Sequence, residues 1–373
     1  MRDDRRASMR LRRLITPLRP QEEGRDWALA KILYGVSPIG FGHASRAVAV
    51  GLKLKEMSLE PEFATGGPAV AFLRSYGFKV HDVVSEPLPS ESGGEMKMAA
   101  LWYLRYWRGY RSTSKRMAAL VTSFSPRLIV GDEEFASVSI AIQRGIQHAM
   151  ISDELQLGFA RGAIAKRIEA RVSRWYADLQ RSVSNLLVPS FGTDSGNIHY
   201  MTPIVRDVTK PREAARAEHG LPLDASLVLF SSSGSGIGDF LLKRSLEAFG
   251  RVCKSSEVFA ISGAAGDAKA ANARQLGVLH DNQDLVAAAD LVISTAGKST
   301  IDESVSSGTP IIAIPIRNHV EQERNAAELG FTSADLERLD ELIPKLMGKR
   351  TQPARYAGAK RTADYLASLL PPD

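Results

Sequence analysis

Short apolar runs alternate with amphipathic stretches along most of this chain. Six runs in the first half have the length and composition of strands: "KILYGV", "PEFATG", "FKVHDVV", "PRLIVGD", "QHAMISDE" and "SNLLVP". Five runs in the second half repeat the pattern: "ASLVLF", "EVFAISG", "LGVLHD", "ADLVIST" and "PIIAIPI". Apolar strands separated by helices are typical of parallel sheets that helices cover on both faces. The pattern predicts an α/β protein with two Rossmann-like domains.

The alternation of strands and helices is interrupted in residues 203–225, where prolines and charged residues gather as they do in an interdomain linker. This break divides the chain into four predicted parts. They are a basic leader over residues 1–28, an N-terminal domain over 29–203, a C-terminal domain over 204–352, and a final helix within 353–373. The final helix could pack back on the N-terminal domain.

Composition limits the chemistry. The single cysteine, Cys253, excludes an intramolecular disulfide and a cysteine-based zinc site, and no two of the seven histidines have the spacing of metal ligands on a helix. No apolar run approaches the ~20 residues of a membrane-spanning helix, and the basic N-terminal segment lacks the hydrophobic core of a signal peptide. We therefore expect a cytoplasmic protein without a bound metal.

The net charge of +6 is concentrated in two segments. Residues 1–13 hold six arginines and two aspartates, and residues 95–117 hold six basic side chains and one glutamate. The rest of the chain is slightly acidic. A nucleic-acid-binding protein would carry basic residues over its folded body, so we expect no nucleic-acid partner. The leader itself has the charge pattern of a solvated segment.

The segment "YGVSPIGFGHASRAVAV" places glycines and a histidine between a predicted strand and a predicted helix. Gly40 and Gly42, on either side of Phe41, let the backbone approach a ligand closely. The amides of this loop and of the helix start favour an anion or a polar acceptor. His43 can take a proton from a hydroxyl, or it can simply cap the helix. The spacing does not fit the dinucleotide motif G-x-G-x-x-G.

The most informative stretch spans residues 289–330. A strand there leads into a turn that ends at Gly297, and a helix begins near Ser299. The free amides of that helix start, with the hydroxyls of Ser299 and Thr300, form a site for a diphosphate. Glu303 lies one turn further on the same face, where its carboxylate can accept hydrogen bonds from both hydroxyls of a ribose.

This order of elements resembles the C-terminal domain of GT-B glycosyltransferases, especially the glycosyltransferase 28 group, which includes the lipid-linked N-acetylglucosaminyltransferase of peptidoglycan synthesis. The first half is similar to uncharacterised, largely archaeal members with a "G-x-G-H-x-x-R" opening, matched by Gly40, Gly42, His43 and Arg46. The resemblance implies two Rossmann-like domains that face a cleft, the acceptor lying on the first domain and a sugar nucleotide on the second. It implies no metal and no cofactor besides the donor substrate.

The resemblance also implies roles for single residues. In chain order, the donor contacts would be Arg206 on the phosphates, Ser233, Gly234 and Ser235 in the first loop, Leu279 and His280 at the base, Gly297, Lys298, Ser299 and Thr300 on the diphosphate, Glu303 on the ribose, and Glu321 and Gln322 on the sugar. His43 would be the general base. The first loop reads "SSSGSG" where relatives often have paired glycines, which leaves the donor open.

Two acidic residues follow the predicted strand in "LIVGDEEF". Asp132 and Glu134 lie at its carboxyl end, where α/β proteins bind ligands. There they could orient an acceptor or assist the base, or they could cap the next helix. Asp153, after "AMIS", is a similar and weaker candidate.

Residues 97–116 form an unusual predicted helix. Its aromatic residues fall in one sector of about 140°: Trp102, Tyr103, Tyr106, Trp107 and Tyr110. Basic residues occupy the rest: Arg105, Arg108, Arg111, Lys115 and Arg116. An aromatic stripe is more often core than contact, but such a helix also suits an anionic membrane surface or a lipid phosphate.

The sequence therefore predicts an inverting glycosyltransferase that moves a sugar from a nucleotide diphosphate sugar to an acceptor hydroxyl. UDP-sugars are the first candidates for the donor, and the acceptor can be lipid-linked. Contact with the inner face of the cell membrane would be peripheral. Two alternatives remain open: an enzyme similar to UDP-N-acetylglucosamine 2-epimerase, and a non-catalytic nucleotide-sugar-binding subunit of a membrane complex.

Overall fold

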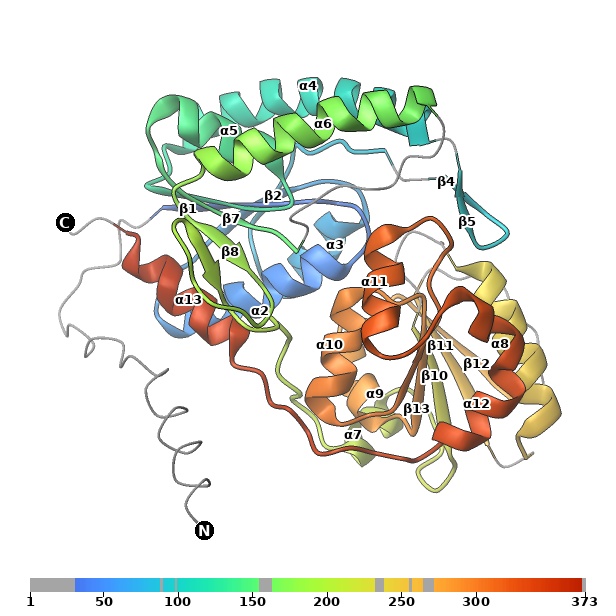
Figure 1. Ribbon diagram of the computed structural model, residues 1–373. Coiled ribbons are helices and arrows are strands. Elements are labelled where there is room, and N and C mark those ends of the chain that lie inside the picture. Colours follow the sequence, from blue (N-terminus) through green and yellow to red (C-terminus); the bar gives the residue numbers. More distant parts are fainter. Residues whose placement is uncertain are drawn as a thin grey trace, which may run out of the picture.

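Two parallel sheets, each with helices on both faces, form the body of the protein (Figure 1). The computed structural model describes residues 31–87, 90–97, 99–153, 163–231, 238–254, 257–263 and 272–370. The predicted leader and the predicted donor loop at Ser233, Gly234 and Ser235 lie outside these ranges. The α/β architecture with two Rossmann-like sheets, predicted from the hydrophobic pattern, is confirmed.

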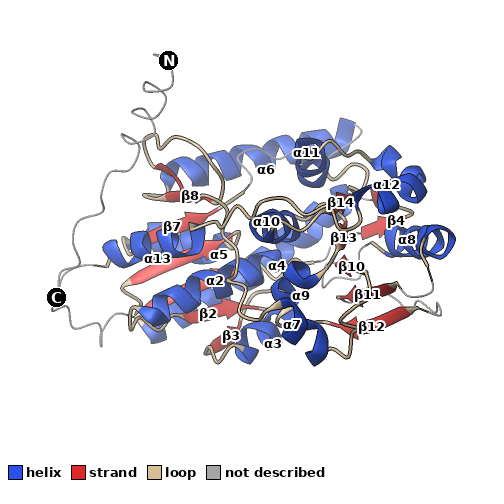
Figure 2. Ribbon diagram, turned by 90° about the horizontal axis from the view of Figure 1, so that it is seen from below, coloured by secondary structure: helices blue, strands red, loops and turns tan. Residues whose placement is uncertain are grey.

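The first sheet has the strand order β3-β2-β1-β6-β7-β8-β9, and all its strands are parallel. The strands are β1 (Ile32–Val36), β2 (Glu62–Thr65), β3 (Val80–Asp82), β6 (Leu128–Asp132), β7 (Gln147–Ile151), β8 (Leu186–Val188) and β9 (Ile198–Tyr200). The helices are α2 (Gly42–Glu56), α3 (Pro68–Ser75), α4 (Ala99–Phe124), α5 (Phe135–Arg144) and α6 (Ala163–Ser182). Helices α4, α5 and α6 lie on the face opposite α2 (Figures 1 and 2).

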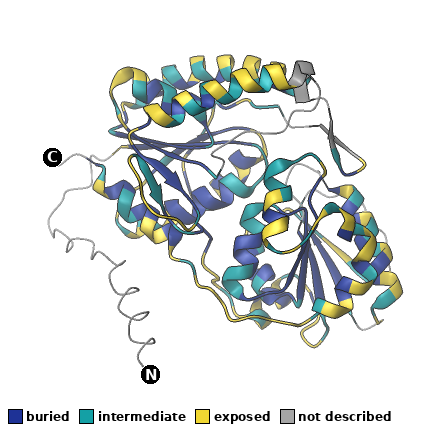
Figure 3. Cartoon of the chain, viewed as in Figure 1, coloured by how far each residue is buried: buried dark blue, intermediate teal, exposed yellow. Residues whose placement is uncertain are grey.

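The second sheet has the order β12-β11-β10-β13-β14. Its strands are β10 (Leu227–Ser231), β11 (Val258–Ser262), β12 (Ala273–Gly277), β13 (Leu291–Ser294) and β14 (Ile311–Ala313). The helices are α7 (Arg212–Glu218), α8 (Asp239–Val252), α9 (Asn282–Ala288), α10 (Lys298–Ser307), α11 (Val320–Glu328), the 3-10 helix η2 (Ser333–Arg338) and α12 (Leu339–Leu346). The central strands of both sheets are buried, as the apolar runs require (Figure 3).

The last helix, α13 (Gly358–Ser368), returns to the first domain and packs beside α2 (Figure 1). Its apolar side chains Ala363 and Leu366 share a core cluster with Ala47 and Val48 of α2. The chain therefore crosses between the two domains twice.

Both sheets reverse their strand order at one point, between β1 and β6 in the first and between β10 and β13 in the second. Open α/β sheets bind ligands outside the carboxyl ends of their strands at such a point. The two helix starts at these points touch, because the Ser299 hydroxyl of α10 donates to the Gly42 carbonyl of α2 at 3.2 Å. The fold thus brings the two glycine-containing turns to one place.

A hairpin that the hydrophobic pattern did not predict joins the two domains. Strands β4 (Ser90–Ser92) and β5 (Glu95–Lys97) extend from the first domain to the second (Figure 1). The Arg317 amide donates to the Gly94 carbonyl at 2.8 Å, and the Asn318 side chain donates to Glu95 at 2.7 Å. These bonds tie the hairpin to the loop that precedes α11.

The strand predicted within "LGVLHD" lies earlier in the structure, as β12. Gly277 has a φ of +70°, a left-handed conformation that ends the strand. Leu279 and His280 therefore lie in the loop after the strand.

Candidate active site

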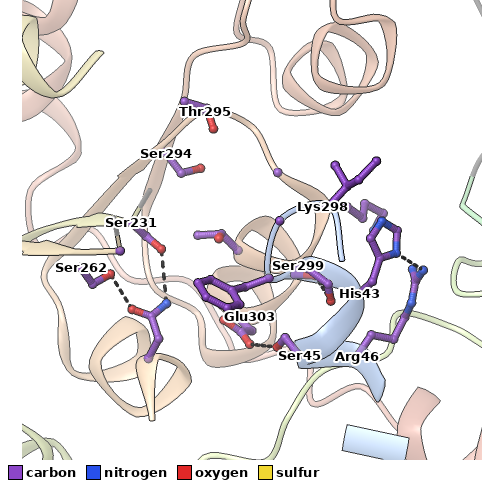
Figure 4. Close-up of a pocket in the computed structure, with 18 of the residues that line it drawn as sticks. His43, Ser45, Arg46, Ser231, Ser262, Ser294, Thr295, Lys298, Ser299 and Glu303 are labelled. Atoms are coloured by element: carbon purple, nitrogen blue, oxygen red, sulfur yellow. Dashed lines mark hydrogen bonds between the residues drawn. The ribbon is translucent and has the colours of Figure 1, made fainter. Parts of the chain in front are cut away.

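One cavity lies between the two switch points (Figure 4). Of the residues predicted from the sequence, these line it: Gly40, Phe41, Gly42, His43, Arg46, Arg206, Leu279, Gly297, Lys298, Ser299, Thr300, Glu303, Glu321 and Gln322. Both domains contribute walls, so the cavity exists only in the folded two-domain chain.

His43 lies in the first turn of α2, directly after the loop that leaves β1. Its Nδ1 is 3.0 Å from Oδ1 of Asp132, the last residue of the neighbouring strand β6. A carboxylate can only accept, so Nδ1 carries the hydrogen and Nε2 keeps the lone pair. The ring is 23% exposed, whereas Asp132 is fully buried. This is the geometry of a general base with an orienting acid.

Arg46 holds Asp132 from the other side. Its Nε donates to Asp132 Oδ2 at 2.8 Å and its Nη2 donates to Oδ1 at 2.5 Å. Its Nη1 donates to both oxygens of Asp153 at 2.6 Å. Nη2 also lies 3.2 Å from His43 Nδ1, so Asp132 Oδ1 is the acceptor that both donors share. One guanidinium thus fixes the buried Asp132 and the partly exposed Asp153 beside the imidazole.

The pKa values of this group follow from its contacts. Burial alone would lower the pKa of His43, but the hydrogen bond and the charge of Asp132 outweigh it and raise the pKa above the usual value. Burial would raise the pKa of Asp132, but the charge of Arg46 and the hydrogen bonds lower it. Asp132 therefore stays ionised, and His43 becomes a stronger base than a free imidazole.

Glu134 takes a different place. Its side chain is the N-cap of α5, where it accepts from the amides of Ala136 and Ser137 at 2.9 Å each. It is buried and does not line the cavity. The capping explanation of the acidic pair thus describes Glu134, whereas Asp132 contacts the candidate base.

The start of α10 has the features of an anion site. Its N-cap, Gly297, provides no side-chain cap, so the first-turn amides remain available at the cavity wall. Ala296, which precedes it, has a φ of +59° that is unusual for a residue with a side chain. A strained residue of this kind is typical of a turn that is held for function. The structure therefore places the predicted diphosphate turn on the cavity.

Glu303 lies one turn further and is buried (Figure 4). Its Oε1 accepts from Arg206 Nη2 at 3.0 Å, from Arg206 Nε at 3.2 Å and from the Ser45 hydroxyl at 3.3 Å. An oxygen with three donors has no further capacity, so a ribose would have to bind through Oε2. Arg206, predicted to reach the phosphates, is instead paired with Glu303 here.

The residues predicted to hold the nucleotide base, Leu279 and His280, lie where the two domains contact each other. Leu279 lines the cavity, but His280 does not. The His280 carbonyl accepts from Arg206 at 2.5 Å and from the Tyr76 hydroxyl, and its ring nitrogen lies 2.9 Å from the Ser75 hydroxyl. His280 is therefore an interdomain contact rather than part of the cavity wall.

The sugar end of the predicted site is formed by α10 and α11. Glu321 and Gln322 both line the cavity, and Gln322 Oε1 accepts from the Ile316 amide at 3.0 Å. The Lys298 amino group pairs with Asp302, one turn later on α10. Burial raises the pKa of Asp302 to about 6, and Lys298 opposes this shift.

Sequence reasoning missed the serines at the strand ends. Ser231, Ser262 and Ser294 are the last residues of β10, β11 and β13, and all three line the cavity (Figure 4). Asn282 joins two of them, since its Nδ2 donates to Ser231 at 3.3 Å and its Oδ1 accepts from Ser262 at 2.7 Å. Their common place, the last residue of a parallel strand, was a usable signal.

The described part of the chain contains neither a metal-binding cluster nor a membrane-spanning helix. No group of three or more His, Cys, Asp or Glu side chains is arranged there to hold a metal ion. No helix there is long and apolar enough to cross a membrane.

Comparisons with known proteins show similarity in sequence and in fold to glycosyltransferases. Residues 247–363 match the glycosyltransferase family 28 C-terminal domain. An uncharacterised glycosyltransferase of Methanopyrus kandleri is 24% identical over 298 residues, which are 75% of this chain and 83% of the relative. The UDP-N-acetylglucosamine–N-acetylmuramyl-(pentapeptide) pyrophosphoryl-undecaprenol N-acetylglucosamine transferase of a Methylobacterium species is 23% identical over 364 residues, which are 88% and 93%. The crystal structure of the glycotransferase of kitacinnamycin has a TM-score of 0.62 at 16% identity and covers 92% of this chain and 99% of that one.

The fold and the matched domain place the chain among the glycosyltransferases of the GT-B kind. More narrowly, residues 247–363 match the sequence pattern of the glycosyltransferase family 28 C-terminal domain. The resemblance inferred from residues 289–330 and from the "G-x-G-H-x-x-R" opening is confirmed, including the similarity to uncharacterised archaeal glycosyltransferases.

Proposed function

We propose that this protein transfers a sugar with inversion from a nucleotide diphosphate sugar, first among them UDP-sugars, to an acceptor hydroxyl. The observation that carries this proposal is the single cavity in which the His43–Asp132 pair of one domain faces the uncapped start of α10 in the other. Such a cavity supplies a base for the acceptor and an anion site for the leaving group.

The proposed reaction is a single displacement. The acceptor oxygen forms a bond to the anomeric carbon as its proton passes to His43 Nε2, and the bond from that carbon to the diphosphate oxygen breaks. Attack from the side opposite the leaving group inverts the anomeric carbon. Negative charge grows on the departing diphosphate, where the amides of Lys298, Ser299 and Thr300 stabilise it. Asp132 stabilises the imidazolium that forms.

A nucleotide screen tests the donor. Calorimetric titration with UDP, GDP and dTDP should give tightest binding for UDP, without added metal. Incubation with UDP-sugars and acceptors should then yield a glycoside and free UDP from the purified chain. The proposal would be contradicted if none of the three nucleotides bound. Release of a free epimer from UDP-N-acetylglucosamine without any acceptor would favour the epimerase alternative, and binding without turnover would favour the non-catalytic subunit.

We further propose that the acceptor is presented at an anionic membrane surface, to which helices α4 and α6 attach. The aromatic stripe of residues 97–116 mainly packs inward: Tyr103 is buried on Glu169, Trp102 donates to the Pro87 carbonyl at 2.9 Å, and Trp107 remains 46% exposed. Apart from Asp178, the charged side chains exposed on α4 and on the adjacent α6 are basic, and they surround the exposed Leu104. They are Arg105, Arg108, Arg111, Lys115, Arg116, Lys166, Arg167, Arg171, Arg174 and Arg181. A surface of this charge attracts anionic lipid headgroups.

The membrane proposal predicts a charge-dependent interaction. Affinity for vesicles containing phosphatidylglycerol, measured by sedimentation, should decrease more than about 30-fold in the double variant Arg105→Glu, Arg108→Glu. Loss of the two positive charges alone costs about 2 kcal/mol, and the two new carboxylates are repelled by the anionic surface. The control variant Lys243→Glu, Lys345→Glu changes two exposed lysines of the other domain and should bind as the wild type does. Equal binding of both double variants would contradict the proposal.

A further inference from the structure

A second cavity opens beside the proposed donor site. It shares the lining side chains Asp153, Lys298 and Glu321 with the first cavity, so the two cavities adjoin. Glu321 lies at the end of the donor site that the sugar would occupy, opposite Leu279 at the base end. A groove that begins there ends next to the reacting carbon of a bound donor. We name it the side groove.

The two walls of the side groove differ in chemistry. One wall comes from the first sheet, through Phe191 after β8 and Tyr200 of β9. Phe191 is 65% exposed, which is unusual for a phenyl ring without a partner molecule. The other wall is α11, which contributes Glu321, Arg324 and Glu328. An apolar aromatic wall therefore faces a wall of charged side chains.

The aromatic wall is held in place by the fold. The Tyr200 ring lies against the backbone of Gly192, where an added Cβ would approach ring atoms to 2.3 Å. Phe191 meets the ring of Tyr356 edge to face, with centroids 5.7 Å apart and planes at 68°. Both rings are thus positioned by packing, as an aromatic platform for a ligand requires.

From these walls we infer that the side groove binds the acceptor and that the acceptor presents a carbohydrate ring there. A pyranose has a C–H face for Phe191 and Tyr200, and hydroxyls that can hydrogen-bond with Glu321, Arg324 and Glu328. A planar polycyclic acceptor would cover the charged wall with apolar surface and leave those charges without solvent. The charged wall also does not suit a lone phosphate, because its two glutamates would repel a phosphate anion. This inference rests on the proposed function for the direction of transfer.

The adjoining cavities also bring the groove close to the base. Asp153, which lines both cavities, is bonded to Arg46, which in turn holds Asp132 behind His43. A ring bound in the groove would therefore lie beside the network that positions the base.

Saturation-transfer NMR on the full chain tests the inference. The probes are methyl β-D-glucopyranoside and chitobiose, each titrated with and without UDP. Phe191→Ala should raise the dissociation constant of the better probe about 10-fold, because the contact between the sugar and the phenyl ring is lost. Ser190→Trp, which fills the groove, should abolish binding. Trp107→Ala removes an exposed aromatic residue of α4 outside the groove and should change nothing.

The outcomes separate this inference from the proposed function. Absence of signal for both sugars, or signal that persists in both groove variants, would overturn it. Binding of the planar phenol 4-methylumbelliferone in place of the sugars would overturn the carbohydrate class. Unchanged UDP affinity in both groove variants is expected, because neither residue lines the donor cavity. If UDP does not bind the wild type while the sugars bind the groove, the donor assignment fails and the side groove stands.

Discussion

His43→Ala is expected to lower turnover by about 10²–10⁴-fold, the range for loss of a general base, and to leave the affinity for UDP unchanged. In the proposed reaction the imidazole takes the acceptor proton through Nε2 while Nδ1 is held by Asp132, and it makes no contact with the nucleotide. Steady-state kinetics with a UDP-sugar and calorimetry with UDP measure the two effects separately. The matched control is His199→Ala, because His199 is similarly exposed at 21% and also lies beside an aspartate, Asp194.

Asp132→Asn examines the same base through its pH dependence. The base acts only when unprotonated, so the acidic limb of the kcat/KM profile follows the pKa of His43. Asp132 raises that pKa, so the wild-type limb should lie above the usual value of about 6.5, and the limb of the variant should move to lower pH. Full turnover in His43→Ala, or a limb that does not move in Asp132→Asn, would show that another group is the base.

Glu303→Gln is expected to weaken UDP binding about 10–100-fold, because in the proposed site the ribose hydroxyls would lose an ionised acceptor. Glutamine is preferred to alanine, since alanine would leave the buried Arg206 without its partner and destabilise the fold by about 3–5 kcal/mol. Calorimetry gives the affinity, and thermal unfolding confirms that the variant is folded. Turnover at saturating donor should fall less than the affinity does.

Glu62→Gln is the control for Glu303. Glu62 is also a partly buried carboxylate paired with side-chain nitrogens, those of Lys79 and His81, but it lies on β2 away from the cavity. Its substitution should leave UDP affinity unchanged. Equal affinity of Glu303→Gln and the wild type for UDP would remove the ribose role, and with it the orientation of the donor.

Local sequence was enough to predict the parts of the site that lie within one strand–turn–helix unit. The loop with Gly40, Gly42 and His43 and the turn at Gly297 were found because glycine, strand and helix start follow each other directly. Asp132 and Glu134 could not be told apart in this way. Asp132 ends β6 and Glu134 follows it by two residues, and only the folded structure shows that Asp132 contacts His43 while Glu134 caps α5.

Arg206 illustrates what the resemblance left undetermined. It was expected near the phosphates, but the structure pairs it with Glu303, 97 positions later, and with His280. This pairing depends on the path of the linker between the two domains, and no local sequence pattern encodes that path. The aromatic stripe of α4 is a similar case, since its hydrophobic period shows one face but does not say what covers it.

The sequence by itself determined the two sheets, the turns at their switch points and the kind of chemistry that these turns support, because those features depend on neighbours within a few residues. Tertiary structure alone decided which side chains meet: Arg46 with Asp132 and Asp153, and the two walls of the side groove. Those contacts join residues from different helices, strands and domains, so they exist only in the folded chain.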